Sequence, residues 1–147
     1  MAELMEYLER AVADKASDLF IVAGSAVSEK AEGDIRPISE GKMLPPDTEQ
    51  LICAIYALAE RSMEHYRATG ADDFSFAVRG LARFRVNAYR QRGSMAAVVR
   101  VVAFEIPDWR ALGVPEAVMD AAGLSHGMVL VTGTAGSGKS TTLACII

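Results

Sequence analysis

The chain has 147 residues, of which 51% are apolar and 23% charged, the balance of a globular protein long enough for one domain or for a small domain and part of another. It has no apolar run long enough to span a membrane and no basic leader before a short apolar stretch, so we expect no membrane insertion, no secretory signal and a cytoplasmic location. The net charge of −4 argues against general nucleic-acid binding.

The first forty residues predict a helix followed by short strands. Leu4, Leu8 and Val12 recur at helical spacing and predict an amphipathic helix over residues 3–15. The apolar stretch SDLFIVAG predicts a short buried strand. A Gly-Asp turn signal then predicts a further strand or hairpin arm over residues 35–38.

Residues 43–70 are the strongest helix prediction. Asp47, with Gln50 three residues later, resembles a capping box, and Gly70 marks the expected stop. The apolar residues expected to face the core are Ile52, Ile55, Ala59, Met63 and Tyr66.

Three β segments follow: DDFSFAVRG, LARFRVNAYR and SMAAVVRVV. Apolar residues such as Phe76 and Phe84 alternate with polar ones such as Arg83 and Arg85, and glycine turns separate the segments. This pattern predicts an antiparallel meander with one apolar face and one basic face.

The meander is rich in arginine. No acidic residue lies between Asp73 and Glu105, whereas the same stretch holds Arg79, Arg83, Arg85, Arg90, Arg92 and Arg100. We therefore expect an anionic partner for this stretch. Solvated arginines, or local salt bridges, are the alternative interpretation.

The composition changes after the meander. Prolines, glycines and a short helical piece over residues 116–122 predict a linker into a second unit. We expect an N-terminal domain over residues 1–105, a linker over 106–124, and the first strand, loop and helix start of another domain over 125–147.

The C-terminal stretch GTAGSGKSTTLACII fits the phosphate-loop pattern G-x-x-x-x-G-K-S. Residues 128–131 predict an apolar strand entering the loop, and TTLACII predicts the first turns of a helix leaving it. Glycines let backbone N–H groups approach phosphate oxygens, and the start of a helix adds its positive dipole end. The predicted nucleotide-binding residues are Gly133, Gly136, Ser137, Gly138, Lys139, Ser140 and Thr141.

Two of these residues have further predicted roles. Lys139 would reach the β- and γ-phosphates of ATP, and the Ser140 hydroxyl would be the Mg²⁺ ligand. Hydrolysis also needs an acidic residue on a second strand for the metal, and a group that positions water. Seven residues follow Ser140, fewer than the roughly one dozen that a crossover to a parallel strand requires. We therefore expect no catalytic residues and no hydrolysis in this chain alone.

The chain resembles the type IV pilus retraction (twitching-motility, PilT-like) ATPases of the secretion ATPase superfamily. The similar stretches are ASDLFIVAG, GDIRPI, DDFSFAVRGLARFRVNAYRQRG, AAVVRVV and GMVLVTGTAGSGKSTTLA, in family order along nearly the whole chain. The family commonly has PTGSGKST where this chain has TAGSGKST, a difference outside the phosphate-contacting positions.

The resemblance implies an α+β fold: a PAS-like N-terminal domain with an antiparallel sheet and helices, followed by the truncated start of a RecA-like α/β ATPase core. It implies a hexameric homo-oligomer that binds ATP and Mg²⁺ and meets pilus base or inner-membrane platform proteins on the cytoplasmic side. In the family, arginines of the N-terminal sheet approach the nucleotide phosphates. The best matching positions are Arg85 and Arg100, and Arg83 is a weaker match.

Three functions are compatible with the sequence. The first is the N-terminal part of a Mg-ATP-dependent pilus retraction motor. The second is a PAS-like interaction module that oligomerises or binds a partner without turnover. The third, a nucleic-acid platform, is weaker because the net charge is negative and the alternation places Phe84 in the core.

Overall fold

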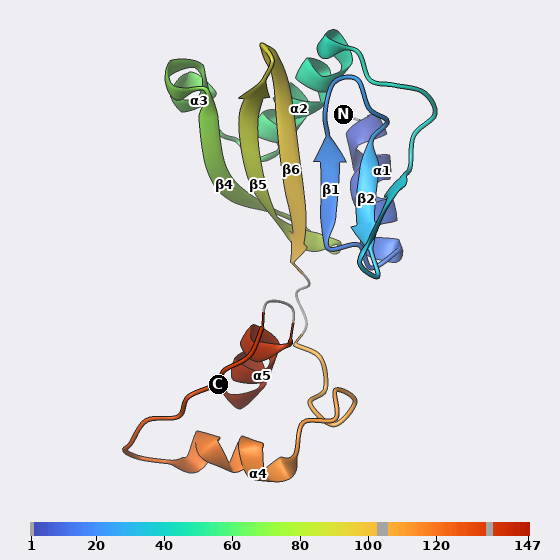
Figure 1. Ribbon diagram of the computed structural model, residues 1–147. Helices are drawn as coiled ribbons and strands as arrows, with labels where there is room; N and C mark the ends of the chain where they lie inside the picture. Colours follow the sequence, from blue (N-terminus) through green and yellow to red (C-terminus); the bar gives the residue numbers. More distant parts are fainter. Residues whose placement is uncertain (1, 103–105, 135–136) are drawn as a thin grey trace. The chain divides into compact units, whose positions relative to one another are not determined.

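The computed structural model describes residues 2–102, 106–134 and 137–147. The chain divides into two units, Met1–Ala103 and Phe104–Ile147, and each is described here by itself (Figure 1). Gly136, one of the predicted phosphate-loop residues, lies outside the described residues.

The first unit contains a six-stranded sheet in the order β3-β2-β1-β6-β5-β4, in which every neighbouring pair is antiparallel (Figure 1). The strands are β1 (Asp18–Ile21), β2 (Ser28–Ala31), β3 (Asp34–Pro37), β4 (Ala71–Val78), β5 (Ala82–Gln91) and β6 (Ser94–Val102). The predicted meander is confirmed as β4, β5 and β6, and the predicted hairpin arm is β3. Because β6 pairs with β1, the meander joins the N-terminal strands in one sheet.

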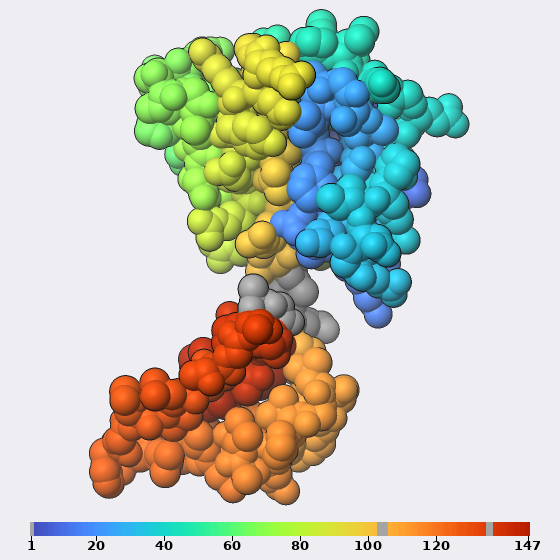
Figure 2. Space-filling view, in the orientation of Figure 1, coloured from blue at the N-terminus to red at the C-terminus, as the bar shows by residue number. Residues whose placement is uncertain are grey.

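Two helices, α1 (Ala2–Ala13) and α2 (Pro45–Leu58), pack on one face of this sheet (Figure 1). The core between them is apolar and includes the fully buried side chains of Leu4, Leu8, Ile52, Ile55, Phe84 and Val99. Figure 2 shows the opposite face, over which the strands lie uncovered by either helix. The predicted burial of Phe84 is confirmed, and the basic residues that alternate with it lie on the open face.

The long helix predicted over residues 43–70 is wrong, because two helices, α2 and α3 (Glu64–Thr69), occupy this stretch. The α2 helix ends at Leu58, and Glu60, two residues later, has a left-handed φ of 50°. The N–H groups of Glu60 and Arg61 donate to the carbonyls of Ala57 and Tyr56, at 3.2 and 3.0 Å. These two bonds form a Schellman motif, which closes a helix without glycine here.

The ends of the two helices were predicted with mixed success. Asp47 is not the residue before the helix but part of its first turn, where its carboxylate accepts the Leu44 N–H at 2.7 Å. Gly70 ends α3 with a φ of 80°, as expected. The predicted capping box of Asp47 with Gln50 is therefore wrong. The box lies three residues earlier, with Leu44 before the helix and Asp47 in its first turn.

The β2 strand was not predicted, because its sequence SEKA is polar and shows no apolar alternation. Its Glu29 is nevertheless fully buried. Glu29 Oε1 accepts from Arg36 Nε on β3 at 2.7 Å, while Oε2 has no partner within the described residues. Arg36 also lies 3.4 Å from a carboxylate oxygen of Asp14, the residue after α1, so one arginine joins the end of α1 to β2 and β3.

The second unit contains α4 (Glu116–Met119), the short 3₁₀ helix η1 (Asp120–Gly123) and α5 (Lys139–Ile146). The predicted helical piece at 116–122 and the helix that follows the loop are confirmed. The predicted strand over residues 128–131 is wrong: the segment has no regular structure, and Met128 is 81% exposed. A strand needs a neighbour for its ladder of hydrogen bonds, and the described part of this unit contains none.

None of the helices in the described ranges has the length and apolar character needed to cross a bilayer.

Candidate functional site

The C-terminal loop leads directly into the first turn of α5. Gly138, with a φ of 87°, is the residue before the helix, and its carbonyl accepts the Thr142 N–H at 2.8 Å. The N–H groups of Lys139, Ser140 and Thr141 therefore have no acceptor within the helix, as is general for a first turn. Such groups, together with the positive end of the helix dipole, favour a bound anion.

The described residues on the two sides of the loop lie close together before the helix. Gly133 has a φ of 152°, and a Cβ atom placed on it would lie 2.7 Å from Ser137 Oγ. A side chain at Gly133 would therefore force the Ser137 hydroxyl to move. The Ser137 N–H donates to the Thr134 carbonyl at 3.3 Å.

Lys139 is folded over its own loop. Its Nζ donates to the Thr134 carbonyl, so the ammonium lies against the loop. This residue is half-buried, whereas Ser140 is exposed. The loop thus gathers a cation, a hydroxyl and free backbone N–H groups, a set that fits a phosphate with a bound Mg²⁺.

The second predicted group of residues lies on the open face of the sheet in the first unit. Arg85 of β5 is directly opposite Arg100 of β6, and Arg100 is directly opposite Asp18 of β1. Like charges on opposite residues of a sheet repel one another unless they are neutralised. Each arginine here has an acidic partner.

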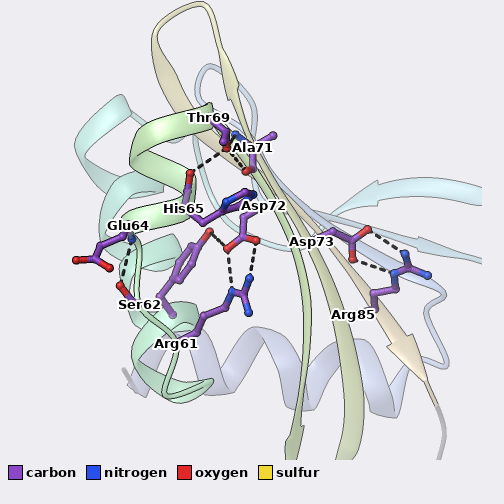
Figure 3. Close-up of polar contacts among 10 residues, drawn as sticks. Arg61, Ser62, Glu64, His65, Thr69, Ala71, Asp72, Asp73 and Arg85 are labelled. Atoms are coloured by element: carbon purple, nitrogen blue, oxygen red, sulfur yellow. Dashed lines mark hydrogen bonds and ion pairs between the residues drawn. The ribbon is translucent and has the colours of Figure 1, made fainter.

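The two ion pairs have different geometries. Arg100 Nε donates to Asp18 Oδ1 at 3.0 Å. Arg85 binds both oxygens of Asp73, from Nε at 3.1 Å and from a terminal nitrogen at 2.9 Å (Figure 3). Hydrogen bonds from Arg85 lower the pKa of Asp73 and raise that of Arg85. These four side chains, with Asn87 and Val98, line a hollow of about 240 Å³.

A further polar cluster lies on the helix-covered side, around Asp72 (Figure 3). Both carboxylate oxygens of Asp72 accept from Arg61, at 2.8 and 2.9 Å, and Tyr56 Oη donates to one of them at 3.1 Å. The Arg61 hydrogen bonds lower the pKa of Asp72, although its burial opposes this. Burial, followed by the bond to Asp72, raises the pKa of Tyr56. The cluster fixes the α2–α3 connection to β4.

The structure brings the predicted residues together in two groups. The described loop residues lie around the start of α5 in the second unit, and Arg85 and Arg100 share a hollow in the first. Local ion pairs, the alternative left open for these arginines, are present at both. Arg83, the weaker match, lies on the same face and donates to Ser75 at 3.3 Å.

Sequence reasoning missed Asp18 and the Asp72 cluster. A signal existed for Asp72, because in an alternating strand it lies on the same face as Phe74 and Phe76. A carboxylate on that buried face needs a partner. No comparable signal existed for Asp18, because its pairing with Arg100 joins residues 82 positions apart.

All of residues 1–147 match the family model for type II/IV secretion system proteins, and the chain belongs to that family.

Within the family the chain is PilT-like. It is 36% identical over 147 residues to the type IV pilus retraction ATPase PilT of Pseudomonas aeruginosa, across 99% of this chain and 42% of the relative. It is 33% identical over 143 residues to the type IV pilus ATPase PilU of the same organism, across 97% of this chain and 37% of PilU.

Solved structures agree with this placement. The crystal structure of the pilus retraction motor PilT with bound ADP superposes with a TM-score of 0.79 at 38% identity, covering 97% of this chain and 41% of that one. The ATPase DotB of Legionella pneumophila gives a TM-score of 0.76 at 25% identity, covering 99% of this chain and 41% of that one. The chain thus spans about two fifths of the length of these relatives.

Proposed function

We propose that residues 1–147 form the N-terminal domain and phosphate loop of an ATP-hydrolysing motor that drives type IV pilus retraction. The observation that carries this proposal is the loop from Gly133 to Ser140, which leads into α5 with free backbone N–H groups, in a chain similar along its length to PilT. The PAS-like and RecA-like assignments, the hexamer and a cytoplasmic position at the pilus base belong to the same proposal.

The residues of the chain have defined tasks in this proposal. The backbone of Ser137 to Thr141 holds the phosphates, Lys139 turns from the Thr134 carbonyl to the β- and γ-phosphates, and the Ser140 hydroxyl is a Mg²⁺ ligand. Mg²⁺ held there would neutralise charge that develops on the phosphates. Arg85 and Arg100 contact the phosphates of a nucleotide held by a neighbouring subunit, because arginine forks match phosphate oxygens.

The test compares this chain with an extended protein in which the remaining length of P. aeruginosa PilT follows residue 147. We expect no ATP turnover by the short chain and Mg²⁺-dependent turnover by the extended protein. Lys139→Ala should abolish that turnover, whereas Lys42→Ala, which removes a lysine outside the loop, should not. An extended protein without affinity for Mg-ATP would contradict the motor, and turnover by the short chain would contradict the assignment of catalysis to the remaining length.

The role of the arginines has its own test in the extended protein. Arg85→Ala and Arg100→Ala should each reduce turnover, while Arg79→Ala, which removes an arginine outside the hollow, should leave it unchanged. Unchanged turnover in both hollow variants would mean that neither arginine contacts phosphate.

A second candidate is a non-catalytic interaction module. The observation in its favour is that the buried apolar core of the described residues lies wholly between Leu4 and Val99, in the first unit. Such a domain can bind a partner without nucleotide. Normal assembly and turnover of an extended protein that lacks residues 1–102 would favour a separable module.

A further inference from the structure

The two arginines in the hollow use their guanidinium groups differently. Arg100 donates to Asp18 through Nε, and its two terminal nitrogens donate to no group in the described part of the chain. Arg85 donates to Asp73 through Nε and one terminal nitrogen, so Asp73 fills the side edge of its guanidinium and leaves fewer N–H groups for another anion than Arg100 has. Arg100 can bind an oxyanion without leaving its partner, and Arg85 cannot do so through that edge.

Their acidic partners are also held differently. The Asp18 side chain is 13% exposed, lies directly opposite Arg100 in the sheet, and accepts a second hydrogen bond from Ser17 Oγ at 2.8 Å. The Asp73 side chain is 47% exposed, and its only donor among the described residues is Arg85, itself 62% exposed. Arg100 is 63% exposed, as much as Arg85, so the difference lies in the carboxylates. The exposed Asp73 exchanges its partner more readily than Asp18, which is largely buried and also held by Ser17.

We propose that Asp18 is a positioning residue that holds Arg100 ready for phosphate, whereas Asp73 occupies Arg85 in place of phosphate and is displaced when phosphate binds. This inference rests on the proposed function, because it concerns the same two arginines. A carboxylate and a phosphate both offer two oxygens to one guanidinium edge, so the exchange keeps the bonding pattern of Arg85.

The arrangement has a physical reason. Arg85 and Arg100 are directly opposite each other, and without a ligand their charges repel. Asp73 neutralises Arg85 in that state. Asp73 competes with any incoming anion for Arg85. A polyphosphate binds both arginines and displaces Asp73 readily, so Asp73 weakens the binding of singly charged anions more than that of a polyphosphate.

The test uses the 147-residue protein and inorganic triphosphate as the probe. The Nε–Hε signals of Arg85 and Arg100 are followed by NMR during the titration. Asp73→Asn should tighten triphosphate binding by up to about fivefold, since it removes an exposed competing pair. Asp18→Asn should weaken binding, because Arg100 loses its anchor although a negative charge has been removed.

Two further variants separate geometry from charge. Asp34→Asn makes the same charge change on β3, outside the hollow, and should leave the affinity within experimental error of the parent chain. Arg100→Lys keeps the charge but has a single nitrogen, which cannot hold Asp18 and triphosphate together through separate atoms, so it should weaken binding. If Asp18→Asn does not give the amide spectrum of a folded protein, Arg100→Lys takes its place as the test.

The outcomes are distinct. Tighter binding by both Asp18→Asn and Asp73→Asn would overturn the inference, because charge alone would explain it. Triphosphate shifts of both arginine signals with no change of affinity in either variant would overturn the inference and leave the proposed phosphate contacts standing. No shift of either signal in any variant would overturn both the inference and the phosphate role of the arginines.

Discussion

Asp72 and Asp73 are neighbours in the sequence, but their carboxylates point to opposite faces of β4 (Figure 3). Asp72 faces the helices, where Arg61 and Tyr56 bind it, and it is 5% exposed. Asp73 faces the open side and binds Arg85. Because successive residues of a strand face opposite sides, the Asp72 carboxylate helps to hold the fold together, whereas the Asp73 carboxylate lies beside Arg85, a predicted phosphate contact.

At this scale we predict that Tyr56→Phe destabilises the first unit by about 1–2 kcal/mol at pH 7, because a hydrogen bond to a buried charge is lost. The pKa of Asp72 is lowered in the folded chain. As the pH falls, Asp72 therefore takes up its proton first in the unfolded chain and only at lower pH in the folded chain. The contribution of ionised Asp72 is thus complete above about pH 4, the unfolded value, and is lost as the pH falls through the lower folded value. Urea unfolding followed by circular dichroism at several pH values measures this. A cost for Tyr56→Phe that does not shrink in acid would contradict it.

The elements show how far local sequence signals reach. Alternation in β4 and β5 and the spacing of Leu4 and Leu8 gave correct strands and a correct helix, because one face of each is buried against a single core. β2 was missed because a polar strand can be held by its neighbours alone. The break after α2 was missed because a Schellman motif with Glu60 in place of glycine carries no sequence signal.

The left-handed conformation of Glu60 after α2 leads us to compare a glutamate-to-glycine substitution at two positions. Glu60→Gly should stabilise the protein, because glycine adopts a φ of 50° without a steric penalty. Glu49→Gly, in the middle of α2, should cost about 1 kcal/mol through lost helix propensity. Thermal melts of the two variants measure the difference. Destabilisation of similar size in both would mean that the left-handed conformation at Glu60 is not strained.

At the scale of the whole chain, the two units differ in what stabilises them. Every fully buried apolar side chain of the described residues lies in the first unit, whereas Met128, Leu130 and Ile147 of the second are largely exposed. The candidate site rests here on a pattern of residue types, since glycines, lysine and serine at fixed spacing predict a phosphate loop. The ion pairs on the sheet were not predictable, because they depend on which strands become neighbours.

We therefore predict that residues 1–102 alone retain the unfolding free energy of the full chain within about 0.5 kcal/mol, the range of changes outside a core. Amide hydrogen exchange should show strong protection in β1, β5 and β6 and little in residues 106–134, where buried apolar contacts are few. Loss of folded circular dichroism in the shortened chain would show that the second unit contributes to the first. Protection of residues 124–131 equal to that of β5 would contradict the difference between the units.

The bond from Arg36 to Glu29 changes what surface exposure means at one edge of the sheet. Arg36 is half exposed, and by that measure it looks freely replaceable. Its guanidinium is, however, the only counter-charge that the described residues supply to a carboxylate sealed from water. Evolution or engineering that alters this arginine has to alter Glu29 in the same step, so two positions that look independent in a list of variants tolerate change only as a couple.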